Sequence, residues 1–81
     1  MKQHVKNYMK YFDYGEQDIV YCEVCGSPAS DVHHILFKSQ GGNDDIENLI
    51  GICRHHHDVS HGKVAGEELT RKQLFEIVAR R

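Results

Sequence analysis

The sequence has too few cysteines for a disulfide framework and no long apolar run. Its 81 residues include 3 Cys, an odd number that cannot pair completely. No N-terminal stretch combines a charged region, an apolar core and a small-residue cleavage site, so we expect no signal peptide. No run approaches the roughly 18 apolar residues of a membrane span. These absences favour a cytoplasmic protein of a reducing compartment, whose cysteines bind metal.

An excess of positive charge is also missing, since the formal net charge is -2. Nucleic-acid-binding proteins are usually basic, so the composition alone argues mildly against that class. Two bound divalent cations would shift this balance. The basic residues are also unevenly placed, and each group fits either a phosphate-binding surface or a solvated helix face. They gather near the two ends, as Lys2, Lys6 and Lys10, then Arg71, Lys72, Arg80 and Arg81.

The short length predicts one domain over residues 1–81 with a marginal hydrophobic core. A domain of this size buries only roughly 60% of the surface that its unfolded chain exposes. Small domains often add a disulfide set or a structural metal for stability. The sequence contains 7 His beside its few cysteines, which favours metal.

Hydrophobic spacing predicts an N-terminal helix followed by a wide hairpin. Apolar residues at helical spacing predict a helix over about residues 2–14, ended by Gly15. The β-branched and large apolar residues of Val32–Phe37 predict a strand, and Leu49–Ile52 is the returning strand. The polar stretch Ser39–Asn48 between them is predicted to be a loop, and loops of that length are usually functional.

Two further helices are predicted after the hairpin. The histidines of Arg54–His61 have helical spacing, and Gly62 is a suitable C-cap. Thr70 and Gln73 fit a capping box, which predicts a final helix over about residues 71–81.

Two pairs of potential zinc ligands share the same spacing. Cys22 and Cys25 are separated by two residues, as are Cys53 and His56. Together they offer three thiolates and one imidazole, the set that closes a four-coordinate structural zinc site. Zinc bound there would contribute to the folding free energy. The alternative is that the cysteines are small buried apolar residues without metal.

The remaining histidines predict a second, open metal site. Neighbouring strand residues point to opposite faces, so His33 and His34 should have different roles. His57 and His61 lie four apart on one helix face, whereas His55 should point away into solvent. A strand histidine facing the helical pair gives three imidazoles for one cation, with positions left for water and phosphate. The other strand histidine could then take a proton from water, because a histidine pKa is ordinarily near 6.5. Extra zinc ligands or a polar surface are the alternatives.

These residues belong to an ordered pattern between Tyr21 and Gly62 that covers about half the chain. Its parts are Cys22-Glu-Val-Cys25-Gly, Asp31-Val-His33-His34-Ile35, Gly41-Gly42, Asn48-Leu49-Ile50, Cys53-Arg-His-His56-His57 and His61. This combination resembles the HNH endonuclease family. The resemblance implies an α+β fold, namely a small zinc-stapled ββα-metal (His-Me finger) fold. In that fold a two-stranded hairpin plus helix forms a core over residues 21–62, flanked here by N- and C-terminal helices.

The resemblance also implies a role for each matching residue. His34 matches the general base, and His33, His57 and His61 match the ligands of the catalytic cation. Asn48 matches the family residue that hydrogen-bonds across the hairpin loop and holds the base in place. The two ligand pairs match the structural Zn²⁺ site of many members. Family members leave 5′-phosphate and 3′-hydroxyl ends.

Two positions depart from many relatives. At the position of His33 many members have Asp, although colicin nuclease domains have His. Carboxylates suit Mg²⁺ whereas three imidazoles favour Zn²⁺, Ni²⁺, Co²⁺ or Mn²⁺, so the identity of the catalytic cation stays open. At the position of His56 many members have a fourth cysteine, which changes zinc affinity and not the role of zinc.

The sequence therefore predicts a metal-dependent nuclease that cuts DNA, most simply double-stranded DNA. Candidate phosphate contacts are Lys38, Arg54 and the N-terminal lysines. The alternatives are a non-catalytic zinc module that binds DNA or protein, and a nuclease that cleaves RNA. A role within an assembly, such as a phage packaging nuclease beside a terminase, also fits the small size. The family suits a bacterial or phage-infected cell.

Overall fold

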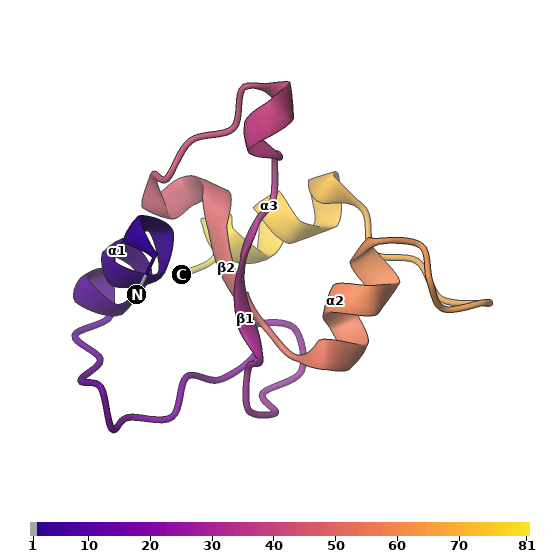
Figure 1. Ribbon diagram of the computed structural model, residues 1–81. Helices are drawn as coiled ribbons and strands as arrows, with labels where there is room; N and C mark the ends of the chain where they lie inside the picture. Colours follow the sequence, from indigo (N-terminus) through magenta and orange to yellow (C-terminus); the bar gives the residue numbers. More distant parts are fainter. Residues whose placement is uncertain (1) are drawn as a thin grey trace.

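A two-stranded antiparallel hairpin lies at the centre of the fold (Figure 1). The computed structural model describes residues 2–81, and in it β1 (Asp31–His34) pairs with β2 (Leu49–Ile52). In this register His33 lies opposite Ile50. All of β2 is buried, so this strand is covered on both faces.

The first strand is shorter than the Val32–Phe37 that the sequence predicts. It begins one residue earlier, at Asp31, and ends at His34. Beyond it, the backbone of Leu36 is hydrogen-bonded by the side chain of Asn48 and not by a partner strand, so regular pairing stops. The prediction of the returning strand is confirmed.

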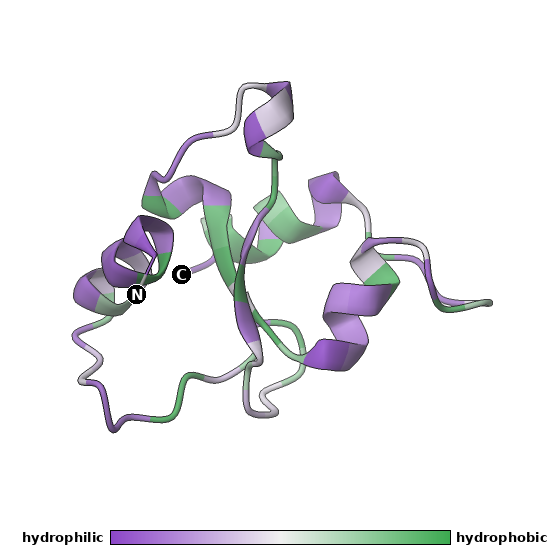
Figure 2. Cartoon of the chain, in the orientation of Figure 1, coloured by the Kyte–Doolittle hydropathy of each residue, from purple (hydrophilic) through white to green (hydrophobic). Residues whose placement is uncertain are grey.

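One face of the hairpin packs against α3 (Arg71–Ala79). Side chains alternate between the faces of a strand, so Ile50 and Ile52 point to the same side. They form a buried cluster with Leu74 and Val78 of α3. Figure 2 shows hydrophobic residues along β2 and part of α3, whereas α2 (Arg54–Ser60) is largely hydrophilic.

The opposite face packs against α1 (Gln3–Tyr11). Tyr8 of this helix is buried with Val32 and Leu49. Gly51 lies beneath the tyrosine ring, where an added Cβ would come within 2.7 Å of the Tyr8 hydroxyl. A larger residue at this position would therefore push α1 away from the sheet.

Helix α1 ends earlier than predicted, because Asp13 and not Gly15 provides the left-handed residue. Asp13 has a φ of 57°, and the Tyr14 amide turns back to donate to the Met9 carbonyl at 2.8 Å. This pattern satisfies the last carbonyls of the helix. Aspartate is one of the few residues besides glycine that adopts this conformation readily.

Helix α2 (Arg54–Ser60) follows β2 directly. Cys53 caps its first turn, and Gly62 lies just after it with a positive φ of 73°, as predicted. The order β1, β2, α2 is that of a ββα-metal fold, and helices flank it at both ends. The predicted capping box at the start of α3 is present. None of the helices within residues 2–81 has the length and apolar character needed to cross a membrane.

Candidate metal centres and active-site cavity

The two predicted zinc-ligand pairs come together where the segment before β1 meets the junction of β2 and α2. The ligand atoms of Cys22, Cys25, Cys53 and His56 all lie within 4.8 Å of one another. The Cys25 and Cys53 sulfurs are 3.8 Å apart, and the Cys53 sulfur is 3.3 Å from His56 Nδ1. Two sulfurs each about 2.3 Å from a tetrahedral ion would be about 3.8 Å apart. The residues therefore fit a four-coordinate metal, and the structure brings the four predicted ligands together.

A tight turn gives the first pair its shape. The Gly26 amide donates to the Cys22 carbonyl at 2.8 Å, with Gly26 at a φ of 82°. Hydrogen bonds from Ser27, its side chain first, lower the pKa of the Cys25 thiol to about 6. The thiolate form that binds metal is thus favoured at this exposed position.

A second group of histidines lies on the α2 side of β1. The ligand atoms of His33, His57 and His61 are within 4.8 Å of one another. The ring centroid of His33 is 5.3 Å from that of His57 and 5.5 Å from that of His61. Burial, then the neighbouring His57 and His61, lowers the pKa of His33 to about 4. Its imidazole therefore stays neutral at ordinary pH, with a lone pair for a cation.

The aromatic ring of Phe37 borders this histidine group. The ring of Phe37 stacks on His61 with centroids 5.7 Å apart, and it meets the His33 ring edge-on at 6.0 Å. The Arg71 guanidinium lies over the same Phe37 ring, 5.1 Å from its centroid. These contacts of Phe37 restrict the rotation of the His33 and His61 rings.

His34 points to the opposite side of β1, as the alternation of strand side chains predicts. Its Nε2 atom lies 2.7 Å from Asp44 Oδ1, and its ring centroid lies 4.4 Å from that of His4. The hydrogen bond from His34 is the main cause that lowers the pKa of Asp44. The carboxylate therefore stays ionised beside the imidazole.

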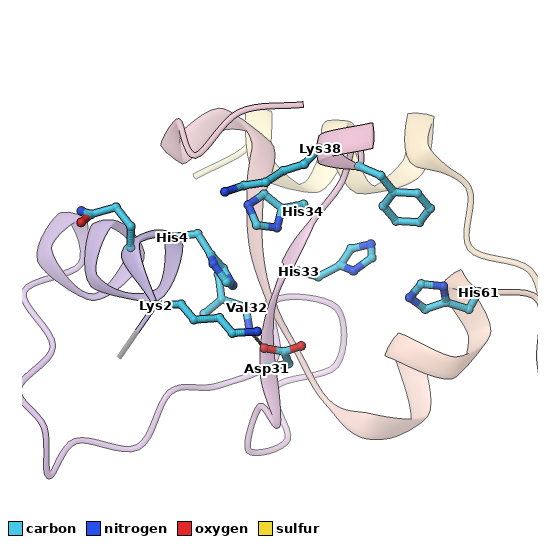
Figure 3. Close-up of a pocket in the computed structure, with 10 residues that line it drawn as sticks. Lys2, His4, Asp31, Val32, His33, His34, Lys38 and His61 are labelled. Atoms are coloured by element: carbon cyan, nitrogen blue, oxygen red, sulfur yellow. Dashed lines mark hydrogen bonds between the residues drawn. The ribbon is translucent and has the colours of Figure 1, made fainter. Parts of the chain in front are cut away.

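Both faces of β1 open into one cavity of about 490 Å³. Figure 3 shows His33 and His61 on one side of the strand and His34 with His4 on the other. The lining joins the two sets of histidines with acidic and basic side chains. It includes His4, Asp31, His33, His34, Lys38 and His61.

The other predicted residues lie around this cavity in different ways. Asn48 is 7% exposed and hydrogen-bonds the backbone across the hairpin loop. Lys38 lies at the cavity and contacts Asp44 at 3.3 Å. Arg54 lies on α2 with its side chain 82% exposed and pairs with Asp58 at 3.5 Å. His55 is exposed, as predicted, and contacts Glu67.

Two residues with no role in the sequence-based predictions lie next to His34 in the fold. His4 comes from α1 and Asp44 from the loop between the strands. The sequence carried a signal only for Asp44, because long ordered loops are often functional. No local spacing connects His4 to the pattern, and only the packing of α1 against the hairpin places it there.

The sequence model of the HNH endonuclease family matches residues 22–63. This segment contains both metal-binding groups and His34, and it is more than half of the 81 residues. Neither the curated proteins nor the solved structures include a significant match to the chain. The family match and the ββα-metal architecture agree, and the chain belongs to the HNH endonuclease family.

Proposed function

We propose that this chain is a metal-dependent endonuclease that hydrolyses phosphodiester bonds of DNA. One observation carries the proposal. His34 and His33 lie on opposite faces of one strand, yet both line the same cavity, together with His61. Phosphodiester hydrolysis needs a base for the attacking water and positive charge at the phosphate, and this cavity offers a candidate for each.

His34 acts as the general base in this proposal. With its Nε2–H donated to Asp44, the neutral imidazole has its lone pair on Nδ1, which accepts the proton of the attacking water. The imidazolium that forms is stabilised by the Asp44 carboxylate. Asn48 holds the loop that carries Asp44, and so acts as a positioning residue.

His33, His57 and His61 would hold the catalytic cation. A divalent cation held there supplies the positive charge that stabilises the scissile phosphate as negative charge grows on it. Three nitrogen ligands favour Zn²⁺, Ni²⁺, Co²⁺ or Mn²⁺ over Mg²⁺. The group of three cysteines and His56 would hold structural Zn²⁺, since it offers four ligands and leaves no position for a substrate.

The substrate in this proposal is double-stranded DNA, bound mainly through its phosphates. Lys38 is exposed at the cavity, which supports its proposed contact with a phosphate beside the scissile bond. Arg54 is proposed as a more distant phosphate contact. Binding dominated by phosphates should weaken as salt is raised and should depend little on base sequence.

The test is cleavage of supercoiled plasmid by zinc-loaded protein with added Mg²⁺, Mn²⁺, Co²⁺, Ni²⁺ or Zn²⁺. We expect metal-dependent nicking or linearisation by the wild type. His34→Ala should be at least about 10²-fold slower, the low end for loss of a general base. His55→Ala is the matched control, because this exposed histidine contacts Glu67 and should cut like the wild type.

Other outcomes would change the assignment. Equal rates for His34→Ala and wild type would remove His34 as the base. Folded, zinc-loaded protein that cuts no DNA with any of these metals would contradict the proposal and favour a non-catalytic zinc module. Preferred cleavage of an RNA of the same sequence would place the substrate in the RNA class.

A further inference from the structure

A third group of metal-binding side chains lies next to the catalytic cavity. His4 from α1, His34 from β1 and Asp44 from the connecting loop have ligand atoms within 4.8 Å of one another. We call these residues the base-side triad. They are separate from the residues of the other two metal-binding groups. All three are partly exposed, so an ion can reach them from solvent.

We propose that the base-side triad is an inhibitory binding site for Zn²⁺ and similar transition-metal ions. Two imidazoles and one carboxylate are ligands that zinc commonly uses in proteins. Nitrogen ligands disfavour Mg²⁺, so this ion should not compete for the triad. With three protein ligands and no thiolate, the triad should bind zinc more weakly than the group of three cysteines and His56.

The contacts of Asp44 set how readily the triad fills. Its Oδ1 is 2.7 Å from His34 Nε2 and 3.3 Å from Lys38 Nζ. An ion between the aspartate and the histidine would replace the Nε2 proton and would repel the ammonium group. The Lys38 side chain is 62% exposed and can turn into solvent. We therefore expect zinc to enter the triad only after stronger sites are filled.

Occupation of the triad removes the basic nitrogen of His34. A neutral imidazole has one proton and one free lone pair. When a metal takes the lone pair at Nε2, the proton resides on Nδ1, and that atom can no longer accept a proton from water. This consequence rests on the proposed role of His34 as general base. It predicts that excess zinc stops cleavage supported by another metal.

The binding of zinc can be measured without any assay of activity. Equilibrium dialysis against excess Zn²⁺, followed by elemental analysis, should give three zinc ions per wild-type chain, one for each group. His4→Ala and Asp44→Asn should each give two, with circular dichroism to verify the fold. His55→Ala should give three. Two ions bound by the wild type, or three bound by folded His4→Ala, would overturn the site.

The inhibitory effect is tested by adding Zn²⁺ to Mn²⁺-supported plasmid cleavage, with each rate divided by that variant's own rate without zinc. The wild type should lose activity over the range in which the third ion binds. His4→Ala should need at least about 10-fold more zinc, the low end for loss of a partner in a metal site. Equal inhibition of His4→Ala and the wild type would mean that zinc acts at the group of His33, His57 and His61. That result would overturn the inhibitory role of the base-side triad.

The zinc-binding measurement and the inhibition assay together separate failure of this inference from failure of the proposed function. If the protein cuts no DNA with any metal, dialysis still decides whether the triad binds zinc. A third ion that binds while Mn²⁺-supported cleavage continues unchanged would overturn the inhibitory role. Loss of cleavage over a zinc range different from that in which the third ion binds would overturn it as well.

Discussion

The side chain of Asn48 holds both backbone groups of Leu36. Its Oδ1 accepts from the Leu36 amide at 2.8 Å, and its Nδ2 donates to the Leu36 carbonyl at 3.1 Å. The same Nδ2 donates to the Asn43 carbonyl at 2.9 Å. One buried side chain thus fastens the segment after His34 to the residue before Asp44. The position of His34 relative to Asp44 therefore depends on Asn48.

Asn48→Ala should therefore lower both stability and activity. The substitution leaves up to three partly buried backbone groups without these partners. Each unsatisfied group costs up to about 1–3 kcal/mol, and partial exposure reduces this figure. We expect a loss of at least about 2 kcal/mol in the free energy of unfolding, measured by urea denaturation. Asn43→Ala is the control, since it removes one exposed hydrogen bond to Asp45 and should change stability by less than about 0.5 kcal/mol. Similar stability of the two variants would contradict the role of Asn48.

Much of the site followed from local rules of chain geometry. The spacing of Cys22 and Cys25 predicts a shared ion because a tight turn brings their sulfurs together. The alternation of strand side chains separates His33 from His34 onto different faces. Such rules act over a few residues, so the sequence reveals them.

Other features depend on contacts between distant segments. His4 reaches His34 only because Tyr8, one turn further along α1, packs against the hairpin. The end of β1 depends on the side chain of Asn48, which a strand pattern cannot indicate. Helix α1 ends at an aspartate in a left-handed conformation, where the usual signal is glycine.

Asp44→Asn should slow cleavage while it leaves the fold intact. Asparagine keeps an oxygen that accepts from His34 but lacks the charge that stabilises the imidazolium. We expect a rate about 10- to 100-fold lower, as for loss of the carboxylate partner of a metal-binding histidine. Single-turnover plasmid cleavage measures the chemical step, and the melting temperature checks the fold. The neighbouring Asp45→Asn is the control, and equal rates for the two variants would show that the Asp44 carboxylate does not assist His34.

Loss of the structural metal should unfold the protein, and Cys25 allows this effect to be separated from packing. Cys22 and Cys53 are buried in the core, whereas Cys25 is exposed. Cys25→Ser therefore removes one ligand with little change in packing. We expect it to lower the melting temperature strongly, and we expect a chelator to unfold the wild type, because metal binding in such sites is part of the folding free energy.

His57→Ala is the comparison for this prediction, because it weakens the histidine group and leaves the four ligands of the structural site in place. It should retain the circular dichroism spectrum and the structural zinc of the wild type. A Cys25→Ser protein that melts at the wild-type temperature would exclude a structural role for the cysteine group.

A partly buried ion pair joins Arg81, which follows α3, to the turn that carries the first two cysteines. Arg81 donates from Nε to Glu23 Oε1 at 2.8 Å and from Nη2 to Oε2 at 2.6 Å. The Tyr8 hydroxyl donates to the same carboxylate at 2.7 Å. The side chains of Arg81 and Glu23 are only 11% and 15% exposed, so this pair is more shielded from water than a surface ion pair. Glu23 lies between two candidate metal ligands, Cys22 and Cys25, and the network therefore supports that turn.

Arg81→Ala should destabilise the protein by at least about 2 kcal/mol. Removal of one partner from a buried ion pair typically costs about 3–5 kcal/mol because the other charge is left unpaired, and the remaining exposure reduces this figure. Arg80→Ala is the matched control, since this neighbouring side chain is exposed and should change stability by less than about 0.5 kcal/mol. In urea denaturation, Arg81→Ala in a Glu23→Gln background should cost less than in the wild type, because no unpaired carboxylate remains. Equal costs in both backgrounds would show that Arg81 stabilises the fold through its other contacts and not through the ion pair. Those contacts are the rings of Tyr8 and Phe12 and the carbonyls of Ile46 and Leu49.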